Sequence, residues 1–283
     1  MQSSNPVFRR AEGFNGRSQT YPASGMSYPA YGSAPAGSGT TPHDPYGQQQ
    51  TLAPTGPMTL DSVVQKTGLT LGLTILTAAI IWVLTPDLSD PTASLGPLYG
   101  LALLGAFGGF ALSLVNSFKR IISPPLVLAY AVMEGLFVGA FSKVVDAAYG
   151  GGIVVGAVAG TFAAVAGTLA AYKFFNIRVS PTFRKWVVAA MFGFVAVALL
   201  DMVLGFFGAS FGFNGFGPMG FVSSLIGLGL GVLMLILDFD FVERGIEAGL
   251  PERESWRAAF GLTVTIIWIY IELLRILAIL RGD

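Results

Sequence analysis

Seven apolar segments, each about long enough to cross a membrane, follow one another along this chain. They cover residues 66–84, 96–118, 124–142, 151–172, 186–207, 219–237 and 256–280. The hydrocarbon core of a bilayer is about 30 Å thick and requires about 20 apolar residues per helix. Because unpaired backbone groups are not tolerated in lipid, such runs form helices. The sequence therefore predicts an all-α membrane protein, with a bundle of seven transmembrane helices over residues 59–283.

The composition agrees with this class and excludes several kinds of site. Charged residues make up 11% of the chain, less than half of the roughly 25% that is usual in soluble domains. The net charge of zero gives no support for nucleic-acid binding. Cysteine is absent, so thiolate metal sites and cysteine nucleophiles are excluded, and His43 is the only histidine. Since we find no hydrolytic constellation, we expect neither an enzyme nor a resident cofactor.

Residues 1–58 form a segment of different character. They are rich in Ser, Gly, Pro, Tyr and Gln, a composition that cannot bury enough apolar surface to offset its chain entropy. No apolar core of a signal peptide is present in them. We therefore predict a disordered tail.

Lysines and arginines predict the orientation of the bundle. They gather after the second, fourth and sixth apolar segments, and few lie in the alternate loops. The gathered residues are Lys119, Arg120, Lys173, Arg178, Arg184, Lys185, Arg244, Arg253 and Arg257. Loops rich in Lys and Arg face the cytoplasm. The tail is thus expected to be cytoplasmic and the C-terminus to lie outside.

Glycines recur at four-residue steps within the apolar segments. Gly152, Gly156 and Gly160 form one such face, and small residues at this spacing let transmembrane helices approach closely. The stretch GFGPMG, residues 215–220, matches a dinucleotide-binding pattern, but it lacks the surrounding strand and helix that this motif needs. We interpret it as a tight turn. Whether any glycine face serves an oligomer is left open.

Four carboxylates fall inside or at the edge of the apolar segments. They are Glu134, Asp201, Asp238 and Glu272. An ionisable residue within a membrane segment is costly and is a functional candidate by default. If they face one another, they form a stepped acidic route across the bilayer. Structural explanations compete: Glu272 could be neutralised by Arg275 three residues later, and Glu134 could bond a neighbouring helix.

Asp238 and Asp240 end the sixth segment, in the stretch LILDFDF. Two residues along a helix correspond to roughly 200° around its axis, so the two side chains should point in different directions. We expect Asp238 to face the bundle and Asp240 to face water. Withdrawn from water, Asp238 could titrate near physiological pH and switch a gate, with Lys119 and Arg120 as counter-ions. An aspartyl intramembrane protease is disfavoured, because LMLIL precedes Asp238 where such proteases carry Gly-x-Gly-Asp.

The region from about 60 to 281 resembles the Bax inhibitor-1 family, also called the transmembrane Bax inhibitor motif or YccA-like family. The resemblance rests on the seven segments, MEGLFVG with Glu134, LILDFDF and the final ELLRIL. The SSNPVF opening and the long tail resemble actinobacterial members, which implies a bacterial plasma membrane. The family implies a central sixth helix and a pH-sensitive calcium leak.

In that family, two aspartates near the cytoplasmic side, on helices six and seven, share a proton and control a gate. Asp238 matches the first, whereas spacing places Thr265 at the second. The paired sensor is therefore not intact here. Asp238 either has another partner, such as Asp240 or Glu134, or proton gating is altered.

Two functions follow from these observations. In the first, the protein is a passive cation leak that favours calcium. Asp238 and Asp240 form its gate and proton sensor, and calcium contacts Asp238 and Glu134 transiently. Asp201 and Glu272 supply further oxygens, and Arg275 is a counter-ion. In the second, it is a non-conducting interaction protein that modulates a membrane-bound protease or a stress response. The tail and the glycine faces are then the working surfaces.

Overall fold

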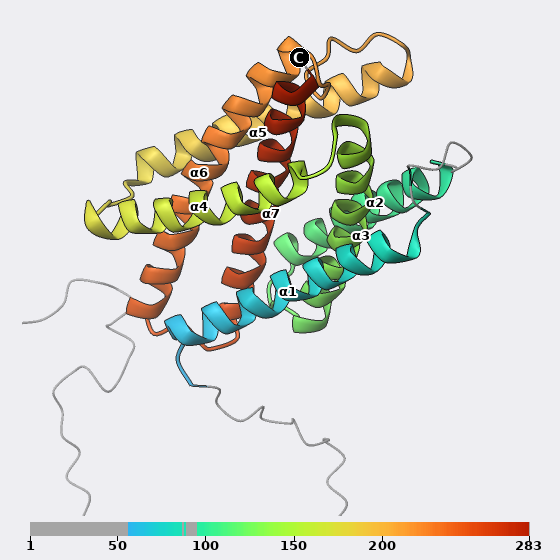
Figure 1. Cartoon of the computed structure of the whole chain (residues 1–283). Helices are drawn as coiled ribbons and strands as arrows, with labels where there is room; N and C mark the ends of the chain where they lie inside the picture. Colours follow the sequence, from blue (N-terminus) through green and yellow to red (C-terminus); the bar gives the residue numbers. More distant parts are fainter. Residues whose placement is uncertain (1–55, 87, 89–94, 283) are drawn as a thin grey trace, which may run out of the picture. The chain divides into compact units, whose positions relative to one another are not determined.

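The computed structural model describes residues 56–86, 88 and 95–282, and seven helices make up nearly all of this part. They are α1 (Leu60–Leu84), α2 (Gly96–Phe118), α3 (Pro124–Tyr149), α4 (Ile153–Phe174), α5 (Pro181–Phe206), α6 (Pro218–Glu247) and α7 (Glu254–Gly282). Each is long and apolar enough to cross a membrane. The predicted fold class is confirmed (Figure 1).

Capping residues and prolines set where the helices begin, so several helix bounds differ from those of the apolar segments. α1 begins six residues before its apolar segment, because Thr59 and Ser62 form a reciprocal capping box. α3, α5 and α6 each carry proline in the first turn. Proline is tolerated there because backbone N–H groups of the first turn form no hydrogen bond within the helix. α6 continues ten residues past the predicted end at 237, so Asp238 and Asp240 both lie on a continuous helix.

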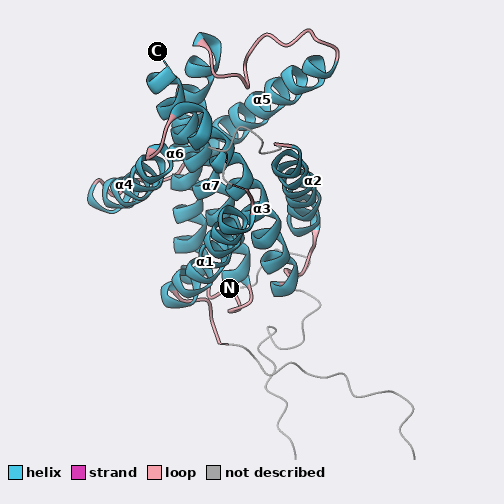
Figure 2. Cartoon of the chain, turned by 45° about the vertical axis from the view of Figure 1, so that its right-hand side comes forward, coloured by secondary structure: helices cyan, strands magenta, loops and turns pink. Residues whose placement is uncertain are grey.

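The last helix, α7, occupies the centre of the bundle. It packs against α1, α3, α4 and α6, whereas α2 lies on α3 and α5 packs mainly on α6, with Phe194 of α5 reaching Trp268 of α7. In its most apolar stretch 67% of the residues are buried, against 39% in α6. Figure 2 shows α7 among these neighbours, with α5 at the periphery. The expectation of a central sixth helix is wrong, since α6 leaves more of its surface open than α7.

Glycines allow the close helix contacts, as the four-residue steps predicted. A Cβ atom added at Gly139 of α3 would lie 2.8 Å from backbone atoms of Ala78 on α1. On α4, Gly156 and Gly160 face leucine side chains of α7. The stretch 215–220 is a turn at residues 215–217 that leads directly into the first residues of α6, and a Cβ at Gly220 would meet the carbonyl oxygen of Gly215 at 2.0 Å.

The chain enters the bundle through a short segment that is fixed to the α6–α7 loop. Met58 N–H donates to Leu250 O (2.7 Å), Glu252 N–H donates to Gly56 O (2.8 Å), and Met58 is 1% exposed. Residues 56–58, which we assigned to the tail, thus belong to the helical unit. The predicted disorder of residues 1–55 lies outside the described residues.

Candidate gate between helices α6 and α7

Asp238 lies in the seam between α6 and α7. Thr265 of α7 donates its hydroxyl to Asp238 Oδ2 at 2.6 Å. One turn earlier on α7, Gly261 leaves room for the other carboxylate oxygen, and a Cβ added there would lie 3.4 Å from Asp238 Oδ1. No described residue forms an ion pair with Asp238. A hydroxyl and a glycine therefore surround a carboxylate that carries no counter-ion.

A tight hairpin sets the register that brings these two side chains together. Gly249 takes a left-handed conformation (φ +62°), which favours glycine, and Leu250 N–H then donates back to Gly245 O. Further along the seam, Gly231 of α6 lies against Ile269 of α7, where a Cβ would approach to 2.8 Å. The turn at Gly249 and the contact at Gly231 keep α6 and α7 close together on both sides of Asp238.

Asp240 points away from this seam, as the helical geometry predicted, but it does not face water. It is 4% exposed and accepts hydrogen bonds from Arg184 Nη2 (2.6 Å) and Arg244 Nε (2.9 Å). Arg244 also donates to the carbonyl of Val179 (2.6 Å). The expectation of a water-facing Asp240 is wrong, because two guanidinium groups neutralise it and tie α6 to the start of α5.

The predicted counter-ions of Asp238 lie elsewhere. Lys119 and Arg120 are both exposed in the α2–α3 loop, and neither forms an ion pair with Asp238. The carbonyl of Arg120 accepts a hydrogen bond from Arg257 (3.1 Å). The structure thus gives Asp238 a partner at the position where the resemblance implied a second aspartate, and that partner is Thr265 rather than Asp240 or Glu134.

Asp201 binds backbone at the opposite end of the bundle. Its Oδ1 accepts from the N–H groups of Phe211 (2.8 Å) and Gly212 (3.2 Å), and its Oδ2 accepts from Asn214 N–H (2.9 Å). These bonds lower the cost of burying the carboxylate, which is 3% exposed. Asp201 therefore shapes the α5–α6 loop.

Glu272 and Arg275 form a buried ion pair. Arg275 Nη1 donates to Glu272 Oε2 at 3.0 Å, and the two side chains are 9% and 5% exposed. Arg275 Nη2 also donates to the carbonyls of Phe213 (2.8 Å) and Gly215 (3.2 Å) in the α5–α6 loop. The competing structural explanation, mutual neutralisation on one helix, matches this geometry.

Glu134 lies apart from the other carboxylates, where α3 meets α2. A Cβ added at Gly109 of α2 would lie 2.9 Å from Glu134 Oε2, and Tyr130, one turn earlier on α3, interacts with the carboxyl group. The contacts of these four acids are thus separate, and none of the contacts described joins one of them to another. Among the described residues, no group of three or more His, Asp or Glu could hold a metal ion.

Lys143 is a buried charge that the sequence analysis did not single out. Its ammonium group donates to Trp82 O (2.9 Å), Thr85 O (2.8 Å) and Thr85 Oγ1 (2.8 Å), and thereby caps the C-terminus of α1. In the sequence, Lys143 stands out as a basic residue near the loops that otherwise lack Lys and Arg, and this position could have marked it as a candidate. Among the described residues Lys143 forms no ion pair, and its three bonds to the end of α1 indicate a role in capping that helix.

The family described as Bax inhibitor 1 like matches residues 5–282. The chain belongs to this family. No curated protein matched the sequence. In this chain Thr265 faces Asp238 across the α6–α7 seam, where the resemblance implied a second aspartate.

Proposed function

We propose that this Bax inhibitor 1 like protein is a passive cation leak that favours calcium, with Asp238 as the proton-sensitive element of its gate. The observation that carries the proposal is the position of Asp238, which joins α6 to α7 through one hydrogen bond from Thr265. An ionisable group held inside a membrane bundle without a counter-ion is costly to maintain. Function is the simplest reason for keeping it.

Protonation at Asp238 changes the charge of the seam by one unit. Thr265 donates to the ionised carboxylate, and a hydroxyl can also accept from a protonated carboxyl group. The contact can therefore form in both states. Because no cation of the described residues pairs with the ionised form, the electrostatic cost of closing the seam differs between the two protonation states. Such a difference biases a two-state element toward one conformation.

The remaining acids have different roles in this proposal. Asp201 and Glu272 support the α5–α6 loop, so we no longer place them on the ion path. Glu134 and Asp238 are the carboxylates left for transient contact with calcium, which prefers oxygen ligands. Two separate acids hold the ion weakly, as a leak requires.

We further infer that the protein lies in a bacterial plasma membrane with the α2–α3, α4–α5 and α6–α7 loops in the cytoplasm. These loops carry Lys119, Arg120, Arg178 and Arg253, in keeping with the rule that places basic loops inside. Asp238 then senses cytoplasmic pH, and the C-terminus of α7 lies outside.

The test is calcium flux in proteoliposomes loaded with a fluorescent indicator, measured between about pH 6 and pH 8. Asp238→Asn is a neutral isostere of the protonated carboxyl group. We expect it to hold the flux at all pH values near the level that the unmodified protein shows at the acid end. Glu243→Gln, an exposed carboxylate on the same helix, is the matched control and should retain the pH dependence.

Two results would refute the proposal. Folded protein that gives no flux above empty liposomes at any pH removes the leak. Flux that keeps its full pH dependence in Asp238→Asn removes Asp238 as the sensor while leaving the leak in place.

The second candidate, a non-conducting interaction protein, draws support from the segment that ends the tail. Met58 is packed on Gly245 and bonded to Leu250, so a partner that binds the tail would act directly on the α6–α7 hairpin. Removal of residues 1–55 separates the candidates. It abolishes partner binding in this one and leaves flux unchanged in the first.

A further inference from the structure

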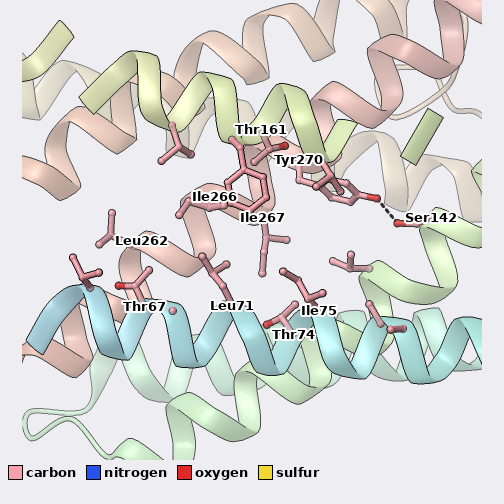
Figure 3. A pocket seen from close by; sticks show the side chains of 18 of the residues that line it. Thr67, Leu71, Thr74, Ile75, Ser142, Thr161, Leu262, Ile266, Ile267 and Tyr270 are labelled. Atoms are coloured by element: carbon pink, nitrogen blue, oxygen red, sulfur yellow. Dashed lines mark hydrogen bonds between the residues drawn. The ribbon is translucent and has the colours of Figure 1, made fainter. Parts of the chain in front are cut away.

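A long apolar groove lies between α1 and α4, with α7 as its floor. Both helices pack on α7, but they do not contact each other. The groove has a volume of about 720 Å³. Figure 3 shows Leu71 and Ile75 of α1 on one side and Thr161 of α4 on the other, with Ile266 of α7 between them.

Four hydroxyls of this groove, those of Thr74, Ser142, Thr161 and Tyr270, are bonded within the protein, whereas the buried hydroxyl of Thr67 has no partner among the described residues. Ser142 and Tyr270 share a hydrogen bond (2.6 Å), and Thr161 donates its hydroxyl to the carbonyl of Ala157 (2.7 Å). No Asp, Glu, Lys or Arg lines the groove. Ions and water would find few ligands there, and stripping their hydration without replacement is costly. The occupant must therefore be apolar.

A flexible hydrocarbon chain fits this groove better than a helix does. The groove opens sideways between two helices that are each able to cross a membrane, so its open side faces lipid. Its walls are bulky and branched, with Leu71, Ile75, Phe162 and Ile266 among them. Helices that dock in membranes use small residues for close backbone approach, and only seven of the 26 lining residues are Gly, Ala, Ser or Thr.

Positive charge stands at one end of the groove. Lys173 follows the lining residue Leu169 by one turn on the same face of α4, is exposed, and forms no ion pair with a described residue. Tyr172 beside it donates to Glu243 near the end of α6, which places Lys173 at the end of the bundle where α6 turns into α7. An anionic headgroup would complement this ammonium group.

We propose that the groove between α1 and α4 binds an anionic phospholipid of the surrounding bilayer, with acyl chain against α7 and phosphate at Lys173. The site is independent of ion conduction, because it shares neither Asp238 nor Thr265 with the candidate gate. A bound lipid would join α1 and α4, which do not contact each other directly.

The experiment uses the full chain in vesicles that contain a phosphatidylglycerol with a photoactivatable diazirine in its acyl chain. Labelled residues are located by mass spectrometry. We expect labelling of Ile75 and Phe162 in the groove to exceed that of Phe192, which is 73% exposed on α5. Replacing the probe by phosphatidylcholine should lower groove labelling about fivefold, the effect of one lysine near an anionic headgroup.

Variants of α1 and α4 supply the controls. At both Gly68 and Gly72 an added Cβ meets nothing within 4 Å, but only Gly68 lines the groove. Gly68→Leu should abolish groove labelling and leave Phe192 labelled, whereas Gly72→Leu should behave as the unmodified protein. Lys173→Gln should remove the preference for phosphatidylglycerol.

Three outcomes would overturn the proposal. They are equal labelling of groove and outer surface, groove labelling that survives Gly68→Leu, and crosslinks that show a second copy of the chain in the groove.

Discussion

Removal of the guanidinium group of Arg275 tests whether the Glu272–Arg275 pair supports the structure or lines an ion path. In Arg275→Met, Glu272 is left buried without its cation at 3.0 Å, and the carbonyls of Phe213 and Gly215 lose a donor. Breaking a buried ion pair from one side costs about 3–5 kcal/mol. This corresponds to roughly a hundredfold to several thousandfold in the folding equilibrium.

The assay is equilibrium unfolding in mixed micelles, followed by tryptophan fluorescence. Arg281→Met is the matched control, because Arg281 is exposed on the same helix and donates only to the carbonyl of Gly151. It should change the free energy of unfolding by less than about 0.5 kcal/mol. Calcium flux of Glu272→Gln, measured at a temperature where the protein is folded, should equal that of the unmodified protein.

The reasoning fails if Arg275→Met unfolds with the same free energy as Arg281→Met. It also fails if Glu272→Gln stays folded and loses flux, since Glu272 would then be an ion ligand after all.

Three further predictions concern packing, the gate and the helix cap. Gly139→Ala should lower the free energy of unfolding by about 1–3 kcal/mol, because the added methyl meets α1 backbone at 2.8 Å; Gly167→Ala, with nothing within 4 Å, should not. Thr265→Asp, which places a second carboxyl group beside Asp238, should move the pH midpoint of calcium flux by about one unit or more, as coupled groups titrate together; an unchanged midpoint contradicts this. Lys143→Met should cost about 1–3 kcal/mol in the same unfolding assay, since three acceptors at the end of α1 lose their donor, and a neutral result would show that water replaces it.

The number and type of the secondary-structure elements followed from the sequence alone, because the bilayer constrains each segment separately. Seven apolar runs became seven helices, because lipid offers the backbone no hydrogen-bond partner outside the helix itself. The opposite directions of Asp238 and Asp240 also followed from helical periodicity alone. Spacing pointed to Thr265 as the position of the implied second aspartate, but the sequence did not predict that the Thr265 hydroxyl itself bonds Asp238.

Only the tertiary structure decided which partners the charged groups have and which helix is central. Asp240 meets Arg184, 56 residues away, and Asp201 meets a loop whose backbone groups carry no sign of this role in the sequence. These contacts depend on the crossing angles and register of helices. Both are set by glycines and side-chain volumes on several helices together, which the periodicity of any one segment does not encode.

The α1–α4 groove also depends on tertiary packing. Each of its walls is an ordinary apolar helix in the sequence, and the space appears because α1 and α4 both pack on α7 without meeting. Hydropathy predicts that a helix enters the membrane, but lipid and protein are equally apolar neighbours. The choice between them therefore depends on packing in three dimensions rather than on the sequence of one segment.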